Sequence, residues 1–366
     1  ITFTVNHDGT VTVTKVGEKD SKGEDNKVVA NGSTLKVTDK DDDLPRKITF
    51  SKVNLGGTEI ADAKIKIFKG ETAEGNPVQS WTSEAGKTKE LDLFYPTNTL
   101  VTGADIIFFW VARMIMFGMY ELKKIPFKNV FFHGIVRDEI GRKMSKSLGN
   151  SPDPLDLIKE FGVDAIRFSM IYNTSQGQDV HFSTDLLGMG RNFANKIWNA
   201  ARFVIMNLEG FDVKSVDKTK LDYELVDKWI ISRLNESAKD VKDCLEKFEL
   251  DNAAKAVYEF LRGDFCDWYV EIAKIRLYND DEDKKISKLT AQYMLWTTLE
   301  QGLRLLHPFM PFITEEIWQK IKVDGDTIML QQYPVADDSL IDVKIEKSFE
   351  YIKEVVSSLR NIRAEK

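Results

Sequence analysis

Residues 128–150 read "KNVFFHGIVRDEIGRKMSKSLGN", an apolar run that leads directly into a polar loop bracketed by glycines. The run at 128–136 predicts a buried strand, and residues 154–170 predict a helix opened by Pro154. Together with an apolar helix expected before the strand, this order indicates part of a parallel α/β sheet. Ligands of such sheets lie at the carboxyl ends of the strands, so we expect a substrate at the loop.

Within the loop, Lys143 and Lys146 stand three residues apart between Gly141 and Gly149. Two ammonium groups on a mobile loop can hold an anion whose charge grows during reaction, as in phosphoryl or nucleotidyl transfer. The glycines allow such a loop to open and close. An isolated Lys-x-x-Lys, however, most often belongs to a solvated surface loop, because short motifs match by chance.

The most apolar stretch, residues 106–120, reads "IIFFWVARMIMFGMY". It is short for a bilayer span and contains Arg113, so it predicts a core helix covered on most sides, with Asp105 as its N-cap. We expect no membrane span and find no signal peptide pattern.

Residues 186–207 predict a basic helix with interleaved aromatic residues and no acidic residue. This composition suits a nucleic-acid backbone contact, although an ordinary amphipathic helix has the same pattern. A polar linker at 208–222 follows, and then helices are expected at 224–246, 251–278, 286–306 and from 314 onward, as in a helical bundle. Helical spacing favours a core position over base stacking for four aromatic residues of this bundle: Trp229, Trp268, Tyr269 and Trp296.

Before residue 92 the pattern is that of β-strands. Apolar and polar residues alternate on both sides of an Asp-Gly turn at 8–9, which predicts a hairpin. Similar runs follow at 33–39, 46–54 and 63–70, and their spacing predicts a β-sandwich. The fold class expected is therefore multidomain: a β-sandwich-like fragment, part of a Rossmann-type α/β nucleotide-binding domain, and an all-α helical bundle.

The composition excludes several classes of protein. A net charge of -7 over 366 residues argues against a generally basic nucleic-acid coat, so any polyanion must meet a local patch. Cys244 and Cys266 are far apart and lack metal-ligand spacing, which argues against a zinc site and a disulfide framework. Two buried thiols in a reducing compartment are expected.

The "KMSKS" pentapeptide at 143–147 resembles the loop of the class I aminoacyl-tRNA synthetases. Its neighbours resemble the valyl family in particular, over about residues 93–366: "TGADIIFFWVARMIMFG", "DPLDLIKEFGVDAIRF", "RNFANKIWNAARF", "DKWIISRLN" and "LRLLHPFMPFITEEIWQKI". The isoleucyl relatives share the loop but have a more polar sequence where this chain has "DIIFFW". An isoleucyl-type ligase is the alternative that this difference opposes.

The resemblance implies an ATP-dependent activation of valine and its transfer to valine tRNA. It assigns transition-state stabilisation to the loop, residues Lys143, Ser145, Lys146 and Ser147. It assigns ATP binding to six positions, with the ribose held near the first two and adenine near the next three: Gly103, Asp105, His133, Gly134, Val136 and Met144. Mg²⁺ is expected with ATP, but no protein ligand for a metal can be named.

The resemblance further implies that Ile106 and Trp110 are walls of the valine pocket. An apolar wall rejects isosteric threonine poorly, which explains why the family edits its product. The tRNA contacts implied are Arg191, Asn195, Lys196 and Trp198. The family's His-x-Gly-His phosphate motif is not in this sequence, so we expect the chain alone to be inactive. The resemblance implies valine tRNA, valine and ATP as partners. It also implies a monomer in the cytoplasm.

Residues 1–92 resemble parts of collagen-adhesin B-type surface modules, on the stretches "ITFTVNHDGTVTVT" and "KITFSKVNLGGTEIADAKIKIFKG". Such modules carry isopeptide bonds, for which Lys52 and Asp39 are the candidates here. This predicts a chimera joined near residues 91–94, and it leaves an adhesin module as an alternative function. The expected domains are 1–92 (β-rich), 93–185 (catalytic half with the loop), 186–220 (stem-contact helix and linker) and 221–366 (anticodon-binding bundle).

Overall fold

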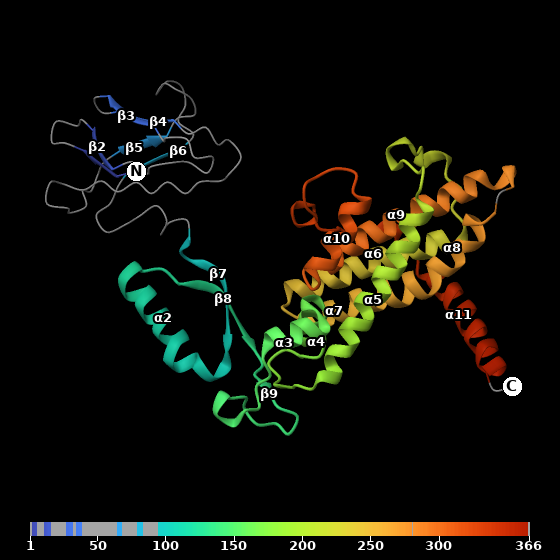
Figure 1. Ribbon diagram of the computed structural model, residues 1–366, viewed down its shortest axis with the longest axis horizontal. Helices are drawn as coiled ribbons and strands as arrows, with labels where there is room; N and C mark the ends of the chain where they lie inside the picture. Colours follow the sequence, from blue (N-terminus) through green and yellow to red (C-terminus); the bar gives the residue numbers. More distant parts are fainter. Residues whose placement is uncertain are drawn as a thin grey trace. The chain divides into compact units, whose positions relative to one another are not determined.

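The computed structural model describes residues 2–5, 11–15, 27–31, 34–38, 64–67, 79–82, 94–279 and 281–364 (Figure 1). The chain divides into two compact units. One comprises residues 1–100 and 113–129, and the other comprises residues 101–112 and 130–366. Among the described helices, none combines the length and apolarity that a bilayer span requires.

Each of the first six strands pairs with a strand next to it in the sequence. β1 (Thr2–Val5) pairs antiparallel with β2 (Val11–Lys15), β3 (Lys27–Asn31) with β4 (Thr34–Thr38), and β5 (Lys64–Ile67) with β6 (Gln79–Thr82). The pairing of Val5 with Val11 agrees with the hairpin expected from the Asp-Gly turn. The sandwich stays a prediction, as does the strand at 46–54, which lies outside the described residues.

β7 (Thr97–Gly103) and β8 (Phe127–His133) form a two-stranded sheet around an apolar helical segment. The amide of Thr97 donates to the carbonyl of Pro126 at 2.9 Å, so the two strands start side by side and run parallel. The segment between them contains a 3-10 turn η1 (Ala104–Ile106), the π-helical turns η2 (Ile107–Val111) and η3 (Gly118–Leu122), and α2 (Ala112–Phe117).

Two predictions about this helical segment are wrong. Asp105 is not its N-cap: it lies inside η1, which begins after Gly103 and has no capping side chain. The segment is also not covered, because Phe108, Met116 and Tyr120 are 76%, 69% and 73% exposed. The physical reason is that β7 and β8 together offer too little surface to cover an apolar segment of this length.

After β8 the chain forms the strand β9 (Val136–Arg137), the loop with the turn η4 (Lys146–Leu148), α3 (Pro154–Phe161), α4 (Val163–Tyr172) and β10 (Val180–His181). β9 and β10 are parallel, with Val136 beside Val180. The single helix expected at 154–170 is two helices. Gly162, at φ 87°, separates them, because this left-handed conformation cannot continue a helix.

The helical bundle follows the predicted order. Its helices are α5 (Thr184–Asn207), α6 (Leu225–Glu246), α7 (Leu250–Tyr258), the π-helical η7 (Glu259–Tyr269), α8 (Val270–Leu277), α9 (Lys285–Leu306), α10 (Pro311–Ile321) and α11 (Val343–Ala364). Short 3-10 turns lie at Val213–Ser215, Lys218–Lys220, Glu282–Lys284, Ile328–Leu330 and Asp338–Leu340. α10 begins at Pro311 rather than at 314, since proline suits the first position of a helix.

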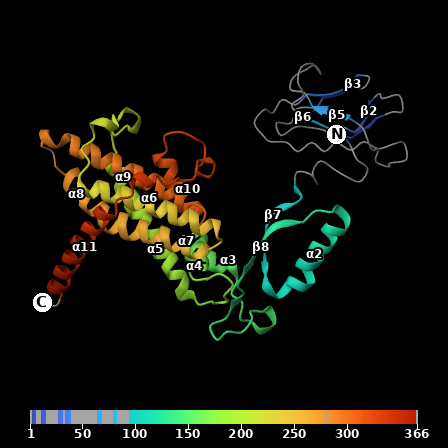
Figure 2. The same ribbon diagram turned by 180° about the vertical axis from the view of Figure 1, so that it is seen from behind.

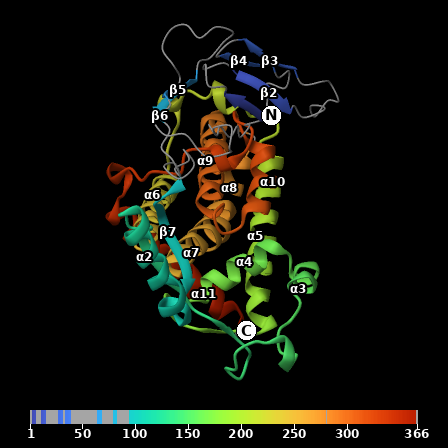
Figure 3. The same cartoon turned by 90° about the vertical axis from the view of Figure 1, so that its left-hand side faces the viewer.

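The core of the second unit runs continuously from α4 into the bundle. The rings of Phe168, Phe193 and Tyr258, from α4, α5 and α7, lie 4.8–6.1 Å apart. Deeper in the bundle, the buried Asp227 accepts two hydrogen bonds from Arg276 Nη1, at 2.9 and 2.7 Å, and one from the Tyr269 hydroxyl at 2.6 Å. α8 and α9 lie side by side (Figure 3). The helices that follow the loop are therefore packed as one body with the bundle.

The predicted core positions of the bundle aromatics are confirmed for Trp229 and Tyr269, which are 1% and 0% exposed. Trp268 and Trp296 are partly buried, and the Trp296 indole donates to the carbonyl of Ile321 at 2.9 Å. Beyond Phe349 the last helix, α11, extends away from the bundle (Figure 2), and most of its large apolar residues there are exposed.

Candidate functional site

The carboxyl end of β7 brings Asp105 next to the loop. Gly103, the last residue of β7, is buried, and a Cβ there would lie 2.7 Å from the Asp105 carboxylate. A side chain at this position would push the carboxylate aside. The Asp105 carboxylate accepts a hydrogen bond from Lys143 Nζ at 3.5 Å, and the two side chains are 51% and 69% exposed. An exposed pair of this kind contributes about 0–1 kcal/mol and exchanges partners readily.

The first part of the loop is a tight reversal. Arg137 and Lys143 form an isolated antiparallel bridge, and the amide of Gly141 donates to the carbonyl of Asp138 at 2.9 Å. Gly141 and Gly149 have φ values of 85° and 63°. These conformations strain residues that carry a Cβ, so the two glycines are needed for the shape of the loop.

The interior of the loop is held by polar side chains. The Asp138 side chain, 12% exposed, accepts hydrogen bonds from the amide of Arg142 at 2.7 Å, from Arg142 Nε at 2.7 Å and from Asn150 Nδ2 at 3.0 Å. The hydrogen bond from Asn150 is the main cause that lowers the pKa of Asp138 to about 2. Asn150 Oδ1 in turn accepts from the amide of Ser145 at 2.9 Å.

The second half of the loop contains further hydrogen bonds between its own residues. The hydroxyls of Ser145 and Ser147 lie 3.1 Å apart, and Ser145 Oγ accepts from the amide of Leu148 at 3.2 Å. Lys146 begins the turn η4, and its side chain lies outside the described part of the structure. Met144 is half-buried and faces an apolar cavity.

The segment expected to hold adenine lies where β8 ends and β9 begins. His133 Nδ1 donates to the carbonyl of Gly134 at 2.9 Å. A Cβ on Gly134 would come within 1.6 Å of the carbonyl of Gln178, so only glycine permits this approach of the chain. Asp179 fixes the segment, since its carboxylate accepts from the amide of Ile135 at 2.8 Å and from Arg137 Nε at 2.5 Å. Both hydrogen bonds lower the pKa of Asp179.

Two cavities adjoin these strand ends. One, of about 390 Å³, is almost entirely apolar and lies between the loop and the helices α3 and α4, with Met144, Leu157 and Ile166 in its lining. The other, of about 220 Å³, is lined by His133, Gly134 and residues of the α6–α7 turn. Val136 lines both. Apolar hollows beside convergent polar groups are typical of ligand sites.

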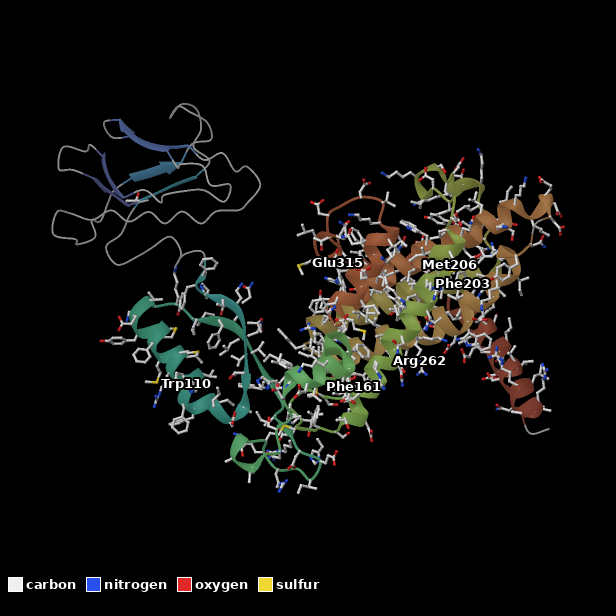
Figure 4. The ribbon with its side chains drawn as sticks, viewed as in Figure 1. Trp110, Phe161, Phe203, Met206, Arg262 and Glu315 are labelled. Atoms are coloured by element: carbon white, nitrogen blue, oxygen red, sulfur yellow. The ribbon has the colours of Figure 1, made fainter. Side chains whose placement is uncertain are left out.

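The two predicted walls of the valine pocket are open to solvent. Ile106, in η1, is 37% exposed, and Trp110, in η2, is 57% exposed (Figure 4). They lie on the same uncovered segment as Phe108.

Four residues of α5 are the predicted tRNA contacts. The Arg191 guanidinium lies over the Phe161 ring at 5.2 Å and is exposed, as are Asn195 and Trp198. Lys196 is half-buried and pairs with Asp267 at 2.6 Å, and this hydrogen bond raises the pKa of Lys196. Lys196 therefore already has a counter-charge, whereas the Arg191 guanidinium lies over an aromatic ring.

The isopeptide candidates Lys52 and Asp39 lie outside the described residues. Within the described residues, no group of three or more His, Cys, Asp or Glu side chains is placed to hold a metal ion.

Sequence reasoning missed Asp138, Asn150 and Asp179. Each is a polar residue in a Gly-rich or turn-like stretch, where a solvated side chain is the usual expectation. The one available signal was that Asn150 ends the glycine-bracketed stretch, at a position where a side-chain amide can satisfy backbone groups on both sides.

Two family models match the chain. Residues 73–183 match "tRNA synthetases class I (I, L, M and V)", and residues 227–366 match "Anticodon-binding domain of tRNA ligase". The first match begins ahead of the boundary expected near residue 92.

Curated relatives share this similarity. The chain is 98% identical over 280 residues to a valine–tRNA ligase of Fusobacterium nucleatum, covering 76% of this chain and 32% of the relative. It is 48% identical over 281 residues to that of Clostridium acetobutylicum, covering 76% and 31%. The chain thus spans about a third of the length of the relatives it matches, and about a quarter of the chain lies outside these alignments.

Solved structures show the same fold at lower identity. A ternary complex of Agrobacterium radiobacter LeuRS with tRNA and LeuAMS matches with a TM-score of 0.54 and 20% identity, over 68% of this chain and 29% of that one. The Mycobacterium tuberculosis methionyl-tRNA synthetase bound by methionyl-adenylate matches with a TM-score of 0.54 and 22% identity, over 63% and 45%.

Proposed function

The chain belongs to the class I tRNA synthetases, as a valine-type segment, and we propose that it supplies the loop half of the valine-activating site and the tRNA-binding bundle of a valine–tRNA ligase. The relatives favour this over the isoleucyl alternative, because those reported above are valine–tRNA ligases. The adhesin alternative concerns residues 1–92 and does not compete for the loop.

The observation that carries the proposal is the position of Lys143. Its ammonium lies 3.5 Å from the Asp105 carboxylate, at the carboxyl end of β7. In the proposed reaction the valine carboxylate attacks the α-phosphate of ATP, and pyrophosphate leaves with the electrons of the broken P–O bond. A cation placed at these strand ends stabilises the charge that develops on the phosphates.

The weak pairing of Lys143 fits this role. The ion pair with Asp105 is exposed, so exchanging the carboxylate for a phosphate oxygen costs about 1 kcal/mol or less. Asp105 is then free to accept hydrogen bonds from the ribose hydroxyls, as the resemblance implies. His133 and Gly134 adjoin the small cavity, which we propose as the side on which adenine binds. Mg²⁺, if bound with ATP, neutralises phosphate charge; no residue of this chain is assigned to it.

We propose that tRNA contacts the outward face of α5. Five residues at intervals of three and four share this face and are exposed: Arg191, Asn195, Trp198, Arg202 and Met206. No acidic residue occurs from Leu186 to Asn207, so the face presents two guanidinium groups and a tryptophan ring to a phosphate backbone. Figure 4 shows Met206 and Phe203 near the far end of this helix.

The activation half of the proposal is tested in a complete ligase in which residues 93–366 replace the corresponding segment. Valine-dependent ATP–pyrophosphate exchange is measured for the parent and for Lys143→Ala. Removing a transition-state cation should lower kcat roughly 10²- to 10³-fold. The control is Lys159→Ala on α3, whose exposed ammonium pairs with Asp156. Equal exchange rates for Lys143→Ala and the control would refute the role of Lys143.

The tRNA half is tested on the chain itself by filter binding, with valine tRNA and a non-cognate tRNA at two salt concentrations. We expect salt-sensitive binding that favours valine tRNA, and a salt slope reduced by about 1 in Arg191→Ala. Binding that is equal for both tRNAs and unchanged in Arg191→Ala would contradict the assignment of α5.

A further inference from the structure

Asn150 is the residue that joins the two ends of the loop. Its amide nitrogen donates to Asp138 Oδ2 at 3.0 Å and to the carbonyl of Lys143 at 3.4 Å, and its amide oxygen accepts from the amide of Ser145 at 2.9 Å. The side chain therefore holds the backbone on both sides of Met144, the residue that follows Lys143.

Asp138 fixes Asn150 in turn. Besides the Asn150 amide, its carboxylate accepts the amide and the Nε of Arg142, so three donors converge on a side chain that is 12% exposed. Each donor restricts the orientation of the carboxylate, and the carboxylate sets which face of the Asn150 amide points to the loop backbone.

The same loop leaves the Lys143 side chain exposed, at 69%. A lysine side chain has four rotatable bonds, so its ammonium can reach a given point only as reliably as its backbone is placed. Residues 143–145 contact the loop base through the Asn150 hydrogen bonds and the bridge between Lys143 and Arg137.

We propose that Asn150, oriented by Asp138, is a positioning residue that fixes the backbone of residues 143–145 and thereby places the Lys143 ammonium at the strand ends. The inference rests on the proposed function for its effect on catalysis. Its structural part, the clamping of the loop, is independent of that function.

The effect on catalysis is tested by a double-mutant cycle in the complete ligase described above. Asn150→Ala should lower kcat for exchange roughly 10- to 100-fold, because several hydrogen bonds of the clamp are lost. If Asn150 acts through Lys143, then Asn150→Ala should cost less than about twofold in a Lys143→Ala background. Equal losses in both backgrounds would overturn the proposal, because a general structural role is additive.

Exchanging the residue types at positions 138 and 150 gives a second test of the same clamp. Asn150→Asp alone places two carboxylates about 3 Å apart and should reduce exchange. Adding Asp138→Asn restores the amide–carboxylate hydrogen bond with its direction reversed and keeps the acceptor for the Ser145 amide, while the weaker donation to the carbonyl of Lys143 is lost. We expect the double variant to recover at least tenfold over Asn150→Asp. A double variant as poor as the single one would count against the clamp.

Loop proteolysis in the full chain separates the clamp from the function. Trypsin can cut after Arg142, Lys143 and Lys146, and cleavage after Lys159 on α3 serves as an internal reference. Asn150→Ala should raise loop cleavage roughly tenfold at an unchanged melting temperature, while Asn207→Ala, which loses a hydrogen bond within α5, should not. Unchanged loop cleavage would overturn the clamp, whereas faster cleavage without any effect of Lys143→Ala on exchange would overturn only the proposed function.

Discussion

Replacing Asp164 with alanine should destabilise the second unit, because this residue caps a helix that begins almost 150 positions later. α10 starts after Met310, which provides no side-chain cap. Instead, the carboxylate of Asp164, on α4, accepts from the amides of Phe312 at 3.2 Å and Ile313 at 2.6 Å. These are the free amides at the start of α10, where a negative charge also interacts favourably with the positive end of the helix dipole.

The magnitude follows from burial. Loss of a capping side chain costs about 0.5–2 kcal/mol on its own. Asp164 is 8% exposed, so its removal also leaves the amides with little access to water, which raises the expected cost to about 2–4 kcal/mol. For a unit of this size the melting temperature should fall by roughly 5–15 °C. Asp164→Asn keeps one acceptor and loses the charge, so it should cost about half as much.

Circular dichroism at 222 nm during heating measures the effect in the full chain. Glu316→Ala is the matched control, since Glu316 lies on α10 itself but is 59% exposed and pairs with Lys320 on the surface of the helix. It should cost less than about 0.5 kcal/mol. A melting temperature for Asp164→Ala equal to that of Glu316→Ala would show that the cap does not hold α10.

Three further outcomes are expected. Burial lowers the pKa of His307 below 6.5, against the opposite effect of Glu315 and Asp164, so the unfolded chain binds the proton first and stability should fall as pH drops below about 6.5. His307→Asn should flatten this fall between pH 7.5 and 5.5, and parallel curves of stability against pH for the variant and the parent would contradict it. Burial raises the pKa of Cys266 to about 12, so iodoacetamide at pH 8 should label Cys244 well before Cys266, as read by peptide mass, and equal labelling in the folded chain would be unexpected. The chain alone, which lacks a His-x-Gly-His motif, should give no valine-dependent ATP–pyrophosphate exchange above a Lys143→Ala control, and a clear signal would refute the need for a second half-site.

The helical bundle could be predicted closely because each of its helices carries its own local signals. The capping box of Glu224 and Asp227 begins α6, and apolar residues at helical spacing continue it to Glu246. The partition at Gly162 was also visible in principle, as a glycine between two amphipathic stretches. It was missed because a single glycine inside a helical pattern is often tolerated.

Burial of the segment at 106–120 could not be predicted, because apolarity shows that a helix prefers to be covered but not which element covers it. Trp110 and Phe108 are therefore exposed in a sequence that is typical of a core helix. In the loop, by contrast, polar contacts were present that the sequence did not predict. Lys143 was predicted as a site residue from its motif, whereas the contacts of Asp138 and Asn150 depend on a loop shape that Gly141 and Gly149 allow through their left-handed conformations.

The loop combines two requirements that oppose each other. In the proposed function its cation must be free to leave Asp105 for a phosphate, which favours an exposed side chain and a weak ion pair. The point from which that side chain extends must be fixed, since a displacement of about 1 Å can cost a hundredfold in rate. Asn150, oriented by the nearly buried Asp138, holds the backbone of the loop and so fixes this point. It makes no contact with the ammonium of Lys143 in doing so, which leaves the side chain free. A loop in which the Lys143 side chain made the fixing contacts could not satisfy both.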